Sequence, residues 1–177
     1  MGATITEDKD PDSILFGIGN LALMAYVAGV LASPLVLVDT GILSAAEITY
    51  NRAVQSFKAG GTKWKTLVSD DDLTFQATYA EVAITNLQRA IQGTLSGVGN
   101  NTIKFGGQRN LDPYYARFEH TRSDGLIVTF DMYKGVASGE FKLGFGDQFI
   151  TYPTTFEANA DAAKPAGQRY GLIKIAA

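Results

Sequence analysis

The hydrophobic pattern changes its period once within a continuous stretch, residues 67–93. From Leu73 to Tyr79, apolar residues alternate with polar ones, as in a half-buried strand. From Val82 the apolar residues recur at helical spacing, and Gly93 follows where a helix C′ residue is expected. The pattern predicts a strand that leads directly into one amphipathic helix over about 82–92.

Period-two alternation recurs in short segments along the rest of the chain. The further predicted strands cover 19–26, 42–56, 102–105, 114–121, 126–133, 140–145, 149–158 and 170–175. Asp124-Gly125 is a hairpin turn signal, whereas 94–101 has no periodicity and is predicted to be a loop. Short strands separated by turns favour a mainly β (α+β) fold, a β-sandwich or closed barrel with one flanking helix.

A long hairpin loop is predicted over about 57–72, between two of these strands. It carries paired glycines, three lysines and the single tryptophan: Lys58, Gly60, Gly61, Lys63, Trp64 and Lys65. An acidic run follows at Asp70, Asp71 and Asp72. Two interpretations are open: a solvated hairpin loop, or a projecting loop whose basic residues meet the acidic patch of an adjacent copy.

The N-terminal region carries two features of its own. Residues 1–13 are polar and acidic without periodicity, which fits either a disordered end or an arm that orders against a neighbouring subunit. Residues 14–38 contain no charge and are long enough to cross a bilayer. Because Gly17, Gly19 and Pro34 interrupt this run, we expect turns and a buried strand there and no membrane span. A single domain over 14–177 follows the arm.

The composition argues against several classes of protein and of functional site. The net charge of −3 and the pI near 5.1 disfavour a dedicated nucleic-acid binder. The absence of cysteine excludes a disulfide scaffold, a thiol nucleophile and thiolate metal sites. Charged residues make up only 19% of a chain rich in tyrosine and phenylalanine, so part of its surface is expected to be buried against partners.

No catalytic motif emerges. The only histidine, His120, lies on an alternating strand beside charged residues, where we expect a surface or rim residue. Serine elbows and nucleotide-binding glycine patterns are missing, and Asp70 to Asp72 lack the ligand spacing of a calcium loop. We expect no enzymatic activity and no cofactor.

The order of elements resembles the tail tube (major tail) proteins of long-tailed bacteriophages. The resemblance covers most of 16–175. It rests on four features: FGIGNLALMAY followed by Asp39-Thr40-Gly41; ITYNRAVQSFK with its glycine-tipped lysine loop; LTFQATYAEVAITNLQRAIQG; and the terminal TYPTTFEANADAAKPAGQRYGLIKI. The apolar segment 27–38 departs from the family, in which a more polar loop is expected.

This resemblance implies a structural virion protein. Such subunits form hexameric rings that stack into a tube, assembled in the bacterial cytoplasm. The tube contacts terminator, distal tail and tape measure proteins and passes genomic DNA without binding it specifically. The resemblance makes residues 58–65 the loop between rings. It places Glu81, Asn86 and Arg89 on a helix near a subunit boundary, and suggests lumen-facing positions at Glu119, Thr121, Thr129 and Asp131.

Two other functions stay open. The tube subunit of a contractile injection or pyocin-like particle would have the same fold. A β-barrel binder of small ligands, of lipocalin type, would instead be a monomer with an apolar interior cavity.

Overall fold

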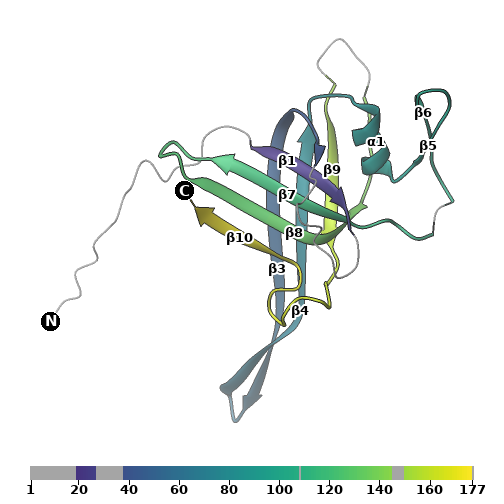
Figure 1. Cartoon of the computed structure of the whole chain (residues 1–177). Helices are drawn as coiled ribbons and strands as arrows, with labels where there is room; N and C mark the ends of the chain where they lie inside the picture. The colour runs from purple at the N-terminus through teal and green to yellow at the C-terminus, as the bar shows by residue number, and fades with distance from the viewer. Residues whose placement is uncertain (1–18, 27–37, 108, 145–149, 177) are drawn as a thin grey trace.

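The computed structural model describes residues 19–26, 38–107, 109–144 and 150–176. Its elements are β1 (Asn20–Ala25), β2 (Val38–Asp39), β3 (Leu43–Ala59), β4 (Thr62–Tyr79), α1 (Ile84–Ile91), β5 (Thr94–Ser96), β6 (Thr102–Lys104), β7 (Tyr114–Thr121), β8 (Ile127–Ser138), β9 (Tyr152–Ala158) and β10 (Gly171–Ala176). The predicted mainly β fold with a single flanking helix is confirmed for the described chain (Figure 1). The predicted arm, 1–13, and the apolar segment 27–37 lie outside the described residues.

One antiparallel sheet contains eight of these strands. Seven follow the order β2-β1-β7-β8-β9-β4-β3, and β10 also pairs with β8. Along β8, residues 127–132 pair with β10 and residues 135–138 pair with β9. Because β7 occupies the other edge of β8, the sheet divides along β8. Strands β1, β7, β8 and β10 therefore cross over β3, β4 and β9 as two layers (Figure 1).

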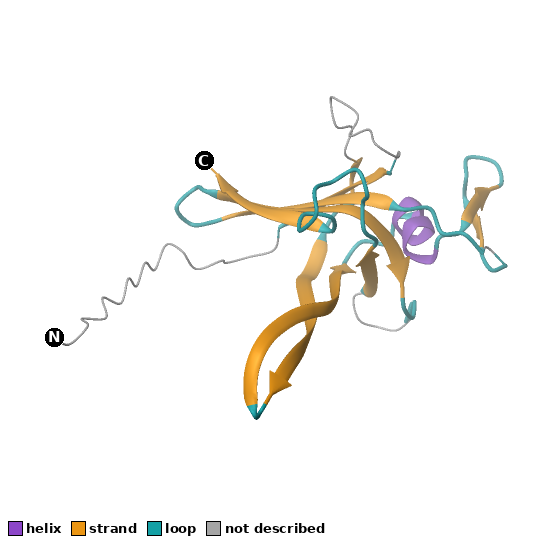
Figure 2. Ribbon diagram, turned by 90° about the horizontal axis from the view of Figure 1, so that it is seen from below, coloured by secondary structure: helices purple, strands orange, loops and turns teal. Residues whose placement is uncertain are grey.

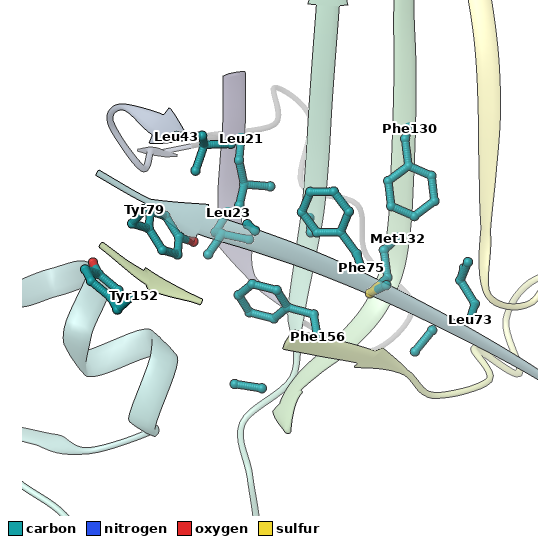
Figure 3. Close-up of a cluster of buried hydrophobic side chains, with 14 residues drawn as sticks. Leu21, Leu23, Leu43, Leu73, Phe75, Tyr79, Phe130, Met132, Tyr152 and Phe156 are labelled. Atoms are coloured by element: carbon teal, nitrogen blue, oxygen red, sulfur yellow. The ribbon is translucent and has the colours of Figure 1, made fainter. Parts of the chain in front are cut away.

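Aromatic and aliphatic side chains fill the space between the two layers. Phe75 of β4 lies 5.7 Å from Phe118 of β7 and 5.5 Å from Phe130 of β8, measured between ring centroids. Tyr79 stacks on Tyr152 at 5.1 Å. Figure 3 shows the rings of Phe75, Phe130, Tyr79 and Tyr152. The other buried residues labelled there are Leu21, Leu23, Leu43, Leu73, Met132 and Phe156. Their burial is the main driving force that holds the layers together.

Helix α1 packs at one end of the sheet and is shorter than predicted. It begins at Ile84, after Ala83 in an extended conformation. At its other end Gln92 adopts the left-handed conformation, with φ of 52°, in the position predicted for Gly93. Gly93 donates its N–H to the carbonyl of Gln88. A Cβ on Gly93 would lie 2.4 Å from Cγ2 of Ile103, so glycine is needed there for close approach to β6.

Several predicted boundaries differ from the observed ones. Residues 140–144 form no strand, whereas β8 continues to Ser138, beyond the predicted end at 133. Part of the predicted loop 94–101 is strand β5, which pairs with β6. The predicted hairpin loop is regular: β3 and β4 pair from Leu43–Tyr79 to Ala59–Thr62. Most of 57–72 is therefore a two-stranded extension of the sheet.

Candidate assembly surface

The distal half of the β3–β4 hairpin projects from the body of the molecule (Figures 1 and 2). We call residues 53–69 the ribbon. Every residue of the ribbon is exposed, on both of its faces. A two-stranded hairpin without a packing partner is only marginally stable in water. The ribbon is therefore the part of the described chain that most clearly lacks a covering surface.

The tip of the ribbon is a tight turn. Gly60 and Gly61 link Ala59 to Thr62, and both have positive φ, at 58° and 82°. A two-residue turn with positive φ at both positions matches the right-handed twist of the flanking strands. A Cβ at either position would meet nothing within 4 Å, so lack of space is not the reason for glycine here. The reason is the positive φ, which residues with a Cβ rarely adopt.

Apolar residues lie on both faces of the ribbon. Val54 is directly opposite Val68, and opposite residues of an antiparallel pair share a face. Leu67 is opposite Gln55, which places Leu67 and Phe57 together on the other face. Their residue exposures range from 42% to 55%. Neither face is covered by any other part of the described chain, so both are available for contact with another molecule.

The tip combines positive charge with an aromatic ring. Lys58 is directly opposite Lys63, and Lys65 is opposite Phe57. This register skips Trp64, which is therefore the extra residue of a β-bulge and is 76% exposed. The three lysines are the only charged residues of the ribbon. The predicted loop residues are thus brought together at one end of the projecting hairpin.

The acidic run lies at the root of the ribbon, on β4. Asp71 is opposite Arg52 on the face that continues into the core, whereas Asp70 and Asp72 are on the reverse face. Asp71 accepts a hydrogen bond from the Tyr50 hydroxyl at 2.9 Å, and Arg52 donates to the same hydroxyl at 2.7 Å. The ribbon therefore runs from an acidic root to a basic tip.

A groove that the sequence pattern did not reveal opens beside this root. It has a volume of about 570 Å³ and lies between β3, β4 and the segment 166–173. Apolar side chains of Ile48, Leu73, Phe130 and Ile173 line it, together with Tyr50, Arg52, Asp71 and Tyr170. Ile173 is 63% exposed although it belongs to the core-facing side of β10. No local pattern predicts the groove, because it depends on where the sheet divides along β8.

Electrostatics at the groove reflect the acidic root. Partial desolvation raises the pKa of Tyr170, and the negative charge of Asp71 and a hydrogen bond to it raise that pKa further. The hydrogen bond to Tyr50 raises the pKa of Arg52, whose guanidinium also lies 5.2 Å from the Tyr50 ring centre. The groove thus offers an apolar floor with one carboxylate, that of Asp71, and two guanidinium groups, those of Arg52 and Arg169.

The predicted subunit-interface residues of the helix do not share one surface. Glu81 is exposed and precedes α1. Asn86 is only 4% exposed, and its amide donates to the carbonyl of Thr40. Arg89 donates to the Asn86 side-chain oxygen at 3.4 Å. Within the subunit, the Asn86 side chain holds α1 on the turn after β2, and its role at a subunit interface stays a prediction.

The four candidate lumen residues all lie on the outer face of β7 and β8, and one of them is buried. Glu119 and Thr129 are opposite one another, and Thr121 follows at the strand end. Asp131 is only 5% exposed. It accepts two hydrogen bonds from Arg117, at 2.7 and 3.0 Å, which makes a bidentate ion pair. Asp131 is therefore a packed, paired carboxylate of the isolated subunit, and its lumen-facing position stays a prediction.

His120 also differs from the prediction. The side chain is 6% exposed and points to the core-facing side of β7, so it is not a surface residue. Within the described ranges no cluster of three or more histidine, aspartate or glutamate side chains could hold a metal ion. The same ranges include no helix with the length and hydropathy to cross a membrane.

Neither the known protein families nor the curated proteins match this chain. Inference about its function therefore depends on the geometry above and on the resemblance of its sequence pattern.

Proposed function

We propose that the protein is the tail tube subunit of a long-tailed bacteriophage. It would assemble with copies of itself into hexameric rings that stack as a tube. The observation that carries the proposal is the ribbon, whose apolar residues on both faces have no partner within the described chain. A self-assembling ring or stack would cover those faces and remove the cost of exposing them.

The charge distribution supports stacking in one direction. Lys58, Lys63 and Lys65 lie at the tip, and Asp70 and Asp72 lie near the root on the reverse face. Lys63 and Asp70 are seven positions apart on β4, which is roughly 23 Å along an extended strand. Contact between the tip of one copy and the root of another joins two different surfaces, and such an interface propagates or closes into a ring.

Sheet edges give a second route for contact between copies. Within the described chain, β3 pairs only with β4, and β10 pairs only with β8. Each strand therefore presents unpaired backbone groups along one edge, which another chain could extend. Joining such edges around a ring would produce the continuous barrel that the resemblance implies for a tube.

The tube would be part of the virion tail and would be assembled in the host cytoplasm. Its lumen would carry genomic DNA without specific binding, since an acidic subunit provides little phosphate neutralisation. Terminator, distal tail and tape measure proteins would be the other partners. No catalysis, cofactor or membrane association is part of this proposal. A contractile injection particle would use the same assembly.

A monomeric ligand binder of lipocalin type is the competing proposal. It requires an open apolar interior, whereas Phe75, Phe130, Met132 and Phe156 pack between the layers (Figure 3). The groove of about 570 Å³ lies at the edge of the layers, beside the ribbon. Its position suits contact with another chain better than enclosure of a small molecule.

Electron microscopy and sizing of the purified full chain test the proposal. Hexamers or tubes are expected, whereas a compact monomer of 18.9 kDa at high concentration contradicts it. Replacing Lys58, Lys63 and Lys65 by glutamate should prevent extension of the tube and leave the subunit folded. The matched control replaces the same lysines by arginine, which keeps the charge and should preserve assembly. Normal polymerisation of the glutamate variant at physiological salt would exclude the lysines from the interface.

A further inference from the structure

We propose that Trp64 of one copy inserts into the groove between the ribbon root and β10 of a neighbouring copy. This inference rests on the proposed self-assembly and adds the acceptor surface for the ribbon tip. Its occupant is a second copy of this chain.

Trp64 has the properties of an anchor residue at a protein interface. It is the only tryptophan of the chain and is 76% exposed at the end of a projecting hairpin. The bulge between the pairs Phe57–Lys65 and Lys58–Lys63 sets it apart from the regular alternation of β4. Buried tryptophans dominate the binding energy of many interfaces.

The groove has the size and chemistry to accept an indole ring. Its volume of about 570 Å³ exceeds the ~150 Å³ of a cavity that holds benzene. Ile48, Phe130 and Ile173 provide the apolar surface. Arg52 at the edge could contact the face of an inserted ring, since guanidinium groups favour aromatic faces.

The charges around the groove are also compatible with a basic tip. The ribbon carries lysines and no carboxylate. The groove lining carries Asp71 together with the guanidinium groups of Arg52 and Arg169. Asp70 and Asp72 lie on the reverse face of the same strand. The three carboxylates of the root outnumber the two guanidinium groups, which leaves a net negative charge for a basic tip.

One copy cannot fill its own groove with Trp64. The groove is bordered by Leu73 on the same strand, nine residues from Trp64. An extended strand places these two residues roughly 30 Å apart. Figure 2 shows the hairpin directed away from the layers. Insertion must therefore occur between copies.

Tryptophan fluorescence provides the first test, because Trp64 is the only tryptophan of the chain. Dispersed subunits should emit as exposed tryptophan does, and assembly of the unmodified full chain should shift the emission to shorter wavelength. Trp64→Ala should raise the concentration needed for assembly at least about tenfold, and Trp64→Phe should restore most of this loss. Assembly without a spectral shift overturns the inference and leaves the proposed function intact.

Crosslinking then locates the acceptor. The chain has no cysteine, so Thr66→Cys and Ile173→Cys can be prepared as separate, differently tagged proteins that retain Trp64. A short bis-maleimide should join the two tags in mixed assemblies. Thr121→Cys, an exposed position on the outer face of β7, replaces Ile173→Cys as the control and should not crosslink.

The outcomes separate the two proposals. A blue shift together with the Thr66–Ile173 crosslink supports insertion into this groove. A blue shift with only the Thr121 crosslink, or with none, shows that Trp64 is buried elsewhere and overturns the inference. Protection of Ile173→Cys from a thiol reagent in dispersed subunits means that the same chain fills the groove, which also overturns it. If the unmodified chain does not assemble, both the proposed function and this inference are overturned.

Discussion

Arg117 and Asp131 face each other across β7 and β8 and form a bidentate ion pair, with Nε to Oδ1 at 2.7 Å and the second hydrogen bond at 3.0 Å. The hydrogen bond to Asp131 raises the pKa of Arg117. Arg117 also donates to the hydroxyl of Tyr115 at 3.1 Å, and Tyr115 stacks on Tyr133. The outer face of this sheet is therefore an organised polar layer with a buried charge at its centre.

Breaking this pair should destabilise the subunit. Asp131→Ala leaves a guanidinium without its carboxylate, and we expect a loss of about 2–3 kcal/mol in the free energy of unfolding. The double variant Arg117→Met/Asp131→Leu removes both charges and should recover most of that loss. Urea denaturation of the single and double variants measures the coupling. A loss below about 0.5 kcal/mol for Asp131→Ala would mean that the pair adds no stability.

The core and the polar details were not equally predictable from the sequence. The alternation from Leu73 to Tyr79 and the change of period after it identified β4 and α1, because both depend on local spacing. Asp131 looked like any polar residue on an alternating strand, and its burial follows from the cross-strand register with Arg117. Asn86 is buried because a distant carbonyl, that of Thr40, lies beneath α1. Such contacts have no signal within one segment.

The ribbon illustrates a different limit. Its residues do not alternate, since both faces are exposed and each carries apolar side chains. Alternation of apolar and polar residues indicates a strand with one buried face. The ribbon has no buried face, so its sequence pattern predicted a loop although the chain continues there as paired strands. The glycines were correctly placed at the tip, and their positive φ explains why they occur as a pair.

Gly93→Ala should destabilise the link between α1 and the small β5–β6 hairpin. A Cβ there would lie 2.4 Å from Cγ2 of Ile103 and 3.0 Å from the carbonyl oxygen of Lys104. Forcing these groups apart should cost about 1–3 kcal/mol in unfolding free energy. Gly144→Ala is the control, because nothing lies within 4 Å of its Cβ position. Equal stability of the two variants in thermal unfolding would contradict the close approach.

Alkaline pH should unfold the subunit partly through the stacked tyrosines. Burial, followed by the charge of Glu81, raises the pKa of Tyr152 to about 12. A phenol whose pKa is higher in the folded state binds its proton more tightly there, so its contribution is complete below about pH 10 and is lost as the pH rises toward 12. Tyr152→Phe should flatten the fall in stability between these values.

The measurement for Tyr152→Phe is denaturant unfolding at several pH values, with Tyr50→Phe as the control. The Tyr50 hydroxyl lies at an exposed site and donates a hydrogen bond to Asp71. Because Tyr152 also donates to the carbonyl of Glu81 at 3.2 Å, its variant should be less stable than the unmodified chain near neutral pH. An unchanged slope of stability against pH in Tyr152→Phe would show that its ionisation is not linked to folding.

Trypsin should cut dispersed subunits first at the ribbon. Lys58, Lys63 and Lys65 lie on paired strands whose two faces are both exposed, so local opening there costs little free energy. Arg117 lies in the central strand β7, where cleavage requires opening of the sheet. In assembled material the ribbon should be protected, with cleavage slower by at least about tenfold. Mass spectrometry of timed digests identifies the sites. Ribbon cleavage at the same rate in dispersed and assembled protein would show that the ribbon takes no part in contacts between copies.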